Sequence, residues 1–369
     1  MTDKKDIKIN ENNNDLSLER RTIYRNRLSN DELNEIKKYM ECLNDIKAIP
    51  YSIWKCIGLY LHIIDDRLIS IFRDFTKNNN NGADYNCANF WYICNNERYN
   101  KIDNINIDTI KSLAYYYNKI RYYNIFKDDF INPSNSAKLL QSYDIAEIIY
   151  NVFKPFHIYV DILDIWFYYN FKSHKWEPDI KGYKLRQYIS TDVYNRFKEL
   201  SDYHSEQSLE SGDYHWIKCE NIRSVMNKLK DTGFKENIMI ELRMLFNIMN
   251  TNLKDKMIEY IIYHKIDDKY TKCMPYNYML IGDLLSYIMN NNDDLLCFQD
   301  GVFVKSLQLI RPGLSTDYIS KQFNFSFNDF IIKYKKPDIV IDKLYELVKN
   351  DINIYDKSYN IIINEINME

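Results

Sequence analysis

Glycine and proline are scarce, with eight Gly and seven Pro in 369 residues. Few residues therefore break helices, and the composition favours a mainly helical protein. None of the eight glycines is followed by Lys and then Ser or Thr, so the phosphate-binding loop GxxxxGK[ST] is absent from the sequence. That loop holds nucleotide phosphates through converging backbone amides, and its absence argues against ATP hydrolysis of the P-loop type.

Paired cysteines are also absent. The seven Cys residues are dispersed, at positions 42, 56, 87, 94, 219, 273 and 297. None forms a CxxC pair, and the six His residues do not cluster beside them. A structural zinc site needs four convergent ligands, so we expect no metal site. An odd, dispersed set of thiols suits a reducing compartment.

Long apolar runs are missing as well. The polar N-terminal region has no apolar signal-peptide core, and no run approaches the roughly 20 apolar residues of a membrane span. We therefore expect a soluble, intracellular protein with no membrane partner, located in the host cytoplasm or at a viral replication site if the protein is viral.

Excess charge of one sign is lacking, because 27% charged residues give a net charge of only −3. Any DNA contact must therefore come from local patches. One candidate patch surrounds Tyr24 and consists of Arg20, Arg21, Arg25 and Arg27. The second lies beside an aromatic run and consists of Lys172, Lys175 and Lys181. For the first, a solvated arm or the first turns of a helix is the competing and favoured interpretation.

The pattern along the chain predicts helical bundles with two small β elements. We expect five segments: a disordered arm (1–32), a small helical domain (33–125), a linker (126–145), a helical domain with β-hairpins (146–330) and a helical tail (331–369). Predicted helices cover 32–46, 51–64, 67–75, 84–94, 108–123, 185–200, 219–229, 235–248, 253–264, 277–289 and 337–350. A strand meander is predicted over 295–310, with a turn at Asp300-Gly301.

The aromatic run at 165–169 and the segment at 174–176 predict two short strands. Trp166 and Trp176 either form a platform on which bases stack, with the lysines on the backbone, or belong to a core. Core packing is favoured because an isolated two-stranded ribbon is marginal in water. Strand alternation would then place Lys175 and Phe167 on the wetter face.

Other polar clusters point to no catalytic chemistry. Adjacent Asp pairs would face opposite sides of a strand, so a two-metal carboxylate site is not predicted. His204 and His215 lie near Glu206, Glu210 and Asp213 in the sequence, so a metal site is one interpretation. The favoured interpretation is an exposed polar loop over 201–213. His62 lies on an apolar helix and is assigned to the core or its boundary.

Two stretches resemble a known family. The first is Asp293-Asp294-Leu295-Leu296-Cys297-Phe298-Gln299-Asp300-Gly301-Val302-Phe303, followed by Ile310-Arg311-Pro312-Gly313 and Asp317-Tyr318-Ile319-Ser320. The second is Ile165-Trp166-Phe167-Tyr168-Tyr169-Asn170, then His174-Lys175-Trp176, Gly182-Tyr183 and Leu185-Arg186-Gln187-Tyr188-Ile189-Ser190. Together they resemble the domain that precedes the superfamily 3 helicase motor in poxvirus-type and giant-virus primase–helicases and in phage and plasmid primases.

A weaker similarity covers the N-terminal part, which looks like the small helical domain that follows the primase polymerase in these proteins. It is carried by Tyr51, Trp54, Gly58, Leu61, Phe72, Phe75, Thr76, Cys87, Trp91, Ile107, Thr109, Leu113 and Ala114. Two departures from the family pattern stand out: Asp300 replaces a usual Asn, and Val304-Lys305 replaces a usual Asp-Leu.

The resemblance implies a non-catalytic linking or collar module of a DNA-replication primase–helicase. It implies single-stranded DNA and a helicase motor or primase subunit as partners, a ring oligomer formed with a motor, and ATP and Mg²⁺ only with that separate motor. No catalytic residue is carried over. The implied family positions are structural: Trp166, Trp176, Asp300, Gly301, Arg311, Pro312, Gly313, Asp317, Tyr318 and Ser320. Two alternatives stay open: one part of a split helicase, and a helical interaction adaptor unrelated to replication.

Overall fold

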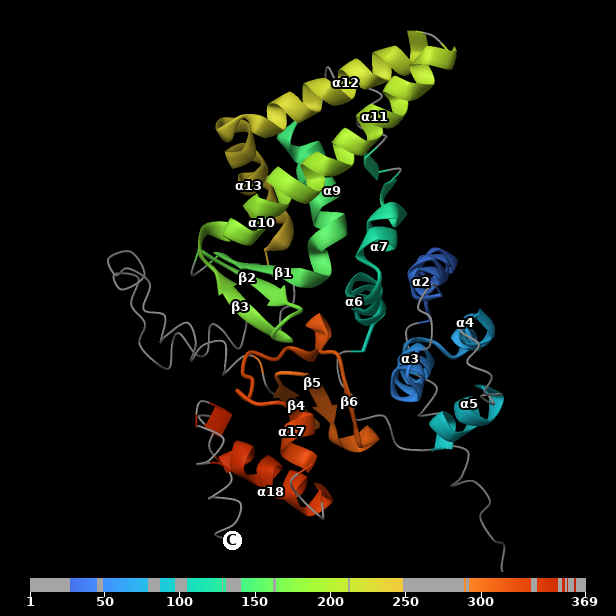
Figure 1. Cartoon of the computed structure of the whole chain (residues 1–369), viewed down its shortest axis with the longest axis vertical. Helices are drawn as coiled ribbons and strands as arrows, with labels where there is room; N and C mark the ends of the chain where they lie inside the picture. Colours follow the sequence, from blue (N-terminus) through green and yellow to red (C-terminus); the bar gives the residue numbers. More distant parts are fainter. Residues whose placement is uncertain are drawn as a thin grey trace, which may run out of the picture.

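The computed structural model describes residues 27–44, 49–78, 87–96, 105–127, 129–130, 141–161, 164–211, 213–247, 289, 292–332 and 337–350, with positions 354, 355, 357 and 362. These residues are mostly helical and include two three-stranded antiparallel sheets, which confirms the predicted mainly α class (Figure 1). The predicted helix over 253–264, nearly all of that over 277–289 and most of the N-terminal arm lie outside the described residues. The predicted domain boundaries stay predictions.

The N-terminal part is a group of short helices. They are α2 (Asn30–Leu43), α3 (Tyr51–Ile64), the 3₁₀ turn Asp66–Leu68, α4 (Ile69–Asn78), α5 (Cys87–Asn96), α6 (Ile107–Tyr117) and α7 (Lys119–Ile125). Ser29 begins α2 with a capping box, since its hydroxyl accepts from Glu32 N at 3.2 Å. The predicted helix over 108–123 is wrong in one respect. Asn118 divides it, because its side chain caps a new helix by accepting from Arg121 N at 3.1 Å.

The first sheet follows α9 (Ser142–Phe153) and the 3₁₀ turn Lys154–Phe156. Its strands are β1 (His157–Val160), β2 (Ile165–Asn170) and β3 (Lys175–Asp179), joined in the order β1-β2-β3. Strands β2 and β3 were predicted, but β1 was not. Four residues bordering a helix are too few for periodicity to distinguish a strand from a helical turn.

The strand register corrects the predicted faces of this sheet. Tyr169 pairs with Trp176 and Phe167 pairs with Pro178, so Phe167 and Trp176 share one face. Trp166 pairs with Asp179 and lies on the other face. Trp166, Phe167 and Trp176 are all buried. Phe167 was expected on a wetter face opposite both tryptophans, but the two tryptophans lie on opposite faces and both faces are covered.

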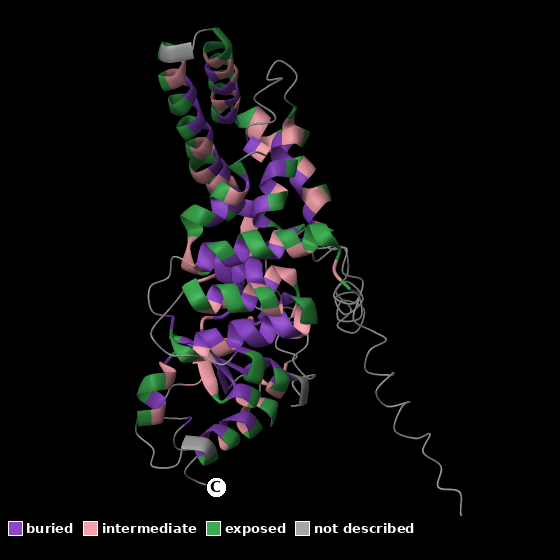
Figure 2. Cartoon of the chain, turned by 90° about the vertical axis from the view of Figure 1, so that its right-hand side faces the viewer, coloured by how far each residue is buried: buried purple, intermediate pink, exposed green. Residues whose placement is uncertain are grey.

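A helical arm extends from this sheet. After the 3₁₀ turn Ile180–Gly182 come α10 (Tyr183–Tyr188), a π-helical turn (Ile189–Val193), α11 (Tyr194–Ser211), α12 (Asp213–Lys230) and α13 (Thr232–Phe246). Helices α11 and α12 pack along each other as a projecting hairpin with a buried stripe between them (Figure 2). The predicted exposed loop over 201–213 is therefore wrong, apart from residue 212, which lies outside the described residues. His204 and Cys219 belong to that stripe, which the surrounding Ser, Glu and Asp residues concealed in the sequence.

The second sheet follows the predicted meander. Its strands are β4 (Leu295–Phe298), β5 (Gly301–Val304) and β6 (Leu309–Arg311), followed by the 3₁₀ turn Ser315–Asp317, α17 (Phe327–Ile332) and α18 (Pro337–Asn350). The 3₁₀ turn Lys305–Leu307 separates β5 from β6. One apolar core runs continuously from Ile36 to Ile319, and a smaller one joins the second sheet to α17 and α18. Among the helices described, none combines the length and apolar character needed to cross a bilayer.

Candidate functional site

The segment after β6 contains the residues of the family-like motif, and its centre is a buried ion pair. Arg311 donates from both terminal nitrogens to the Asp317 carboxylate, at 2.8 and 2.7 Å. The two side chains are only 2% and 3% exposed. Although burial alone would lower the pKa of Arg311, Asp317 holds it above its usual value. Arg311 is thus a neutralised structural cation, not a group that is free to bind phosphate.

Gly313 lies where no side chain fits. A Cβ there would come within 2.6 Å of both His174 Cβ and the Tyr169 hydroxyl. Its backbone N–H donates to His174 Nδ1 at 3.2 Å. Pro312 accepts from Arg311 Nη1 through its carbonyl oxygen at 2.9 Å. The Arg311-Pro312-Gly313 turn is therefore packed directly against the end of the β2–β3 hairpin.

The following 3₁₀ turn ties this segment to helix α6. The Ser315 and Ser112 hydroxyls lie 2.6 Å apart, and those of Thr316 and Thr109 lie 3.1 Å apart, all buried. Trp176 donates its indole N–H to the Ser315 carbonyl at 2.8 Å. Residues 311–317 therefore form a junction of an N-terminal helix with both sheets, and we call this segment the junction.

Trp176 is also held by the residues that flank the junction. Tyr318 stacks with Trp176 at 6.5 Å between ring centroids, and Trp176 N donates to the Ile319 carbonyl at 2.7 Å. Ser320 is half-buried. The two tryptophans therefore occupy the core that was favoured over a stacking platform.

The turn before β5 is equally constrained. Gly301 has φ +151°, and a Cβ there would approach the Arg311 carbonyl oxygen to 2.5 Å. Asp300 accepts from Phe327 N at 2.7 Å and from Ser326 Oγ at 2.7 Å, so it caps α17. Although partial burial opposes ionisation, these hydrogen bonds lower the pKa of Asp300. Asp300 therefore has a structural role here.

The predicted cationic residues do not form one patch in the described part of the chain. Arg27 and Lys172 are exposed, and Lys175 is half-buried at the start of β3. Lys181 is also exposed, but it follows the end of β3, whereas Lys172 and Lys175 lie at the start of that strand. Arg20, Arg21 and Arg25 lie outside the described residues. DNA binding by these side chains stays a prediction.

The arm holds two histidines that the sequence linked to a metal site. His204 Nδ1 and His215 Nδ1 are 2.9 Å apart across the α11–α12 hairpin. Burial lowers the pKa of His204, with further lowering by Lys218. No cluster of three or more metal-binding side chains occurs within the described residues. The histidine pair is therefore a contact between the two helices.

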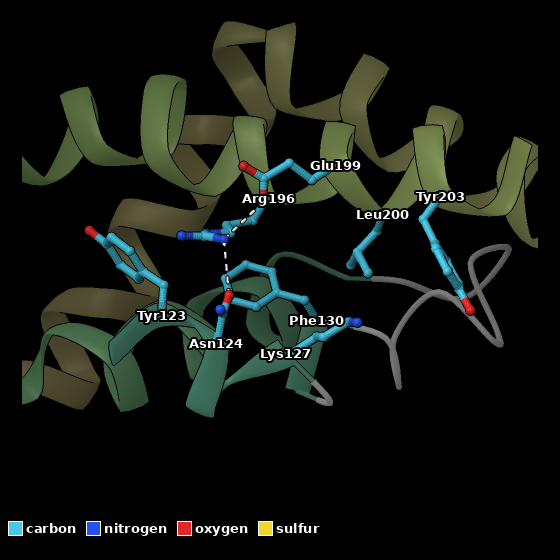
Figure 3. A pocket seen from close by; sticks show the side chains of 8 residues that line it. All are labelled: Tyr123, Asn124, Lys127, Phe130, Arg196, Glu199, Leu200 and Tyr203. Carbon is cyan, nitrogen blue, oxygen red and sulfur yellow. Dashed lines mark hydrogen bonds and ion pairs between the residues drawn. The ribbon is translucent and has the colours of Figure 1, made fainter. Parts of the chain in front are cut away.

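A pocket of about 290 Å³, which the sequence did not predict, lies between α11 and the segment formed by α7 and the residues that follow it to Phe130 (Figure 3). It is lined by Tyr123, Asn124, Lys127, Phe130, Arg196, Glu199, Leu200 and Tyr203. On one side, Tyr123, Lys127 and Phe130 follow an i, i+4, i+7 spacing. On α11, Arg196, Leu200 and Tyr203 follow the same spacing. Two helical stripes that mix aromatic and cationic side chains were the signal available in the sequence, which does not show that the stripes face each other.

Comparison with known proteins finds a distant viral relative but no matching family. No protein-family model matches the chain. The chain is 23% identical over 337 residues to a protein of Acanthamoeba polyphaga mimivirus described as "Putative helicase L207/L206". The alignment covers 87% of this chain and 31% of the mimivirus protein, so the chain spans about a third of that relative's length.

Proposed function

We propose that this protein is a DNA-replication module related to viral helicases. In this proposal it serves as a collar or linker that binds single-stranded DNA and a motor or primase subunit, without hydrolysing ATP itself. The observation that carries the proposal is the alignment of 87% of the chain with the mimivirus protein described as "Putative helicase L207/L206". The sequence contains no phosphate-binding loop, which supports a role beside a motor.

The junction supports a linking role. Side chains of α6 and Trp176 of β3 bond directly to Ser315 and Thr316, and a Gly301 Cβ would clash with the Arg311 carbonyl oxygen. These hydrogen bonds and close contacts tie α6 to both sheets, so we expect little relative movement between them. A rigid connector of this kind could hold a primer-making module at a fixed distance from a motor.

The proposal is tested on the purified full chain with two readouts. We expect binding of a fluorescein-labelled dT20 that weakens with salt, by roughly 0.7 log unit in affinity per log unit of salt for each phosphate contact. Phosphate release from ATP should stay at background with or without DNA. ATP turnover that co-purifies with the chain through several columns would contradict the proposal, as would affinity unchanged from about 50 to 300 mM salt.

One observation favours an interaction adaptor as the second candidate. Large apolar side chains are exposed near the end of the arm, with Leu209 88%, Trp216 58% and Ile217 52% exposed. Exposed apolar patches often mark protein–protein contacts. Absence of DNA binding, together with self-association in sedimentation that Trp216→Ala abolishes, would favour this candidate.

A further inference from the structure

We propose that the pocket between α7 and α11 binds one nucleotide of a single DNA strand, with a base on Tyr203 and a phosphate on Lys127. The inference rests on the proposed function and gives it a site. The volume of about 290 Å³ is just below the range of roughly 300–1,000 Å³ typical of small-molecule pockets. A pocket of this size accepts one nucleotide and excludes a large cofactor.

The inner walls of the pocket are formed by buried, mainly apolar side chains. Tyr123, Phe130 and Leu200 are buried, and the rings of Phe130 and Phe197 are in contact at 5.3 Å between centroids. The Tyr123 hydroxyl donates to Asp192 Oδ1 at 3.2 Å. Asp192 lies in the π-helical turn before α11, and such turns often occur at functional sites. The pocket is thus built before any ligand arrives.

One cation of the pocket is held in place. The Arg196 guanidinium lies 5.0 Å from the centre of the Tyr123 ring, and its Nη1 bonds to Glu199 at 2.8 Å and to Asn124 at 3.4 Å. These contacts fix the plane of the guanidinium, against which a base can stack. Because Glu199 is 64% exposed, the pair is screened by solvent, and a phosphate can compete with Glu199 for Arg196.

The second cation is available. Lys127 is exposed, its Nζ lies 5.5 Å from the centre of the Tyr203 ring, and no carboxylate pairs with it within the described residues. Tyr203 is 48% exposed, so much of its ring faces solvent. An exposed ring beside an ammonium group that no described carboxylate pairs with suits a base stacked next to its own phosphate, the combination that sequence-tolerant single-strand binding uses. An acidic peptide would use the cations but leave the aromatic rings without a role.

The arm provides a matched control. On α12, Lys218 Nζ lies 4.5 Å from the centre of the Tyr214 ring, and Tyr214 is 62% exposed. This pair has the same chemistry as Lys127 and Tyr203 but does not line the pocket. Loss of affinity at one pair and not at the other therefore separates a specific site from general attraction to exposed cations and rings.

The test is fluorescence anisotropy of labelled dT20 with the full chain at about 50 mM salt. Tyr203→Ala should weaken binding about ten-fold through lost stacking, with the salt slope unchanged, and Tyr203→Phe should restore binding. Lys127→Gln should lower the salt slope by roughly 0.7, the value expected for one phosphate contact. Tyr214→Ala and Lys218→Gln should bind as the unaltered chain does, and all variants should keep its thermal melt. In competition, dTMP should bind far more weakly than dT20.

Several results would overturn the inference. If the chain binds dT20 but Tyr203→Ala and Lys127→Gln bind normally, the pocket is not the site, although the proposed function stands. Equal losses at both pairs, or competition by poly-glutamate as strong as that by dT20, would show general anion binding instead. If the unaltered chain does not bind dT20 at all, both this inference and the DNA-binding part of the proposed function fail.

Discussion

Replacing Asp317 with Asn should destabilise the protein strongly, because it leaves Arg311 as an unpaired buried charge. Asp317 accepts two hydrogen bonds from Arg311 and one from Leu314 N at 2.8 Å. Removing one partner of a buried pair typically costs about 3–5 kcal/mol. Folded domains are stable by about 5–15 kcal/mol, so this loss is a large fraction of the total.

The measurement is urea denaturation followed by circular dichroism. The matched control is Glu220→Gln, which breaks an exposed pair with Arg223 whose side chains are 46% and 53% exposed, and should change the free energy of unfolding little. Changing both Arg311 and Asp317 to Leu should recover part of the loss, because no charge is then left buried. A loss for Asp317→Asn no larger than that for Glu220→Gln would refute the assignment of the junction as a buried structural core.

Two further perturbations test the core around the first sheet. Trp176→Ala should lower the free energy of unfolding by about 3–5 kcal/mol, since it removes a buried ring and the hydrogen bond to Ser315. An unchanged thermal melt together with lost DNA binding would instead support the stacking interpretation. His157 is buried, which lowers its pKa to about 3, so it stays neutral in the fold while the unfolded chain takes up a proton below about pH 6.5. The contribution of His157 to the free energy of unfolding therefore falls by about 1.4 kcal/mol for each pH unit as the pH is lowered from roughly 6 to 3. His157→Gln should make the free energy of unfolding less dependent on pH than it is in the unaltered chain. An identical pH dependence in the two proteins would argue against a neutral His157.

The sequence predicted the elements with strong local signals. Helix α3 has the predicted bounds because Pro50 can begin a helix and an apolar run follows, and α18 likewise spans the predicted range. The meander over β4–β6 was predicted because Asp300-Gly301 is a strong turn signal. The core assignment of the two tryptophans agrees with their burial, since a ribbon of that length needs cover.

The parts that depended on distant contacts could not be predicted. The break at Asn118 shows in the sequence only as an Asn inside an apolar pattern. Within the arm, residues 201–213 were mistaken for a loop because the buried stripe there is narrow and surrounded by polar side chains. The pocket joins residues near 123–130 to residues near 196–203, and nothing local to either segment indicates that they face each other. The role of Asp317 as the partner of Arg311 likewise depends on the turn between them.

The central claim is that this helicase-related chain binds single-stranded DNA between α7 and α11 without hydrolysing ATP. The most direct test is ultraviolet cross-linking of the full chain to a dT20 that contains 5-iodo-deoxyuridine, followed by mass spectrometry of the linked peptides. The account predicts cross-links to Tyr203, and to Tyr123 at lower yield, both lost when unlabelled dT20 competes. Cross-links confined to the exposed aromatic residues of α12, such as Tyr214 and Trp216, would contradict it.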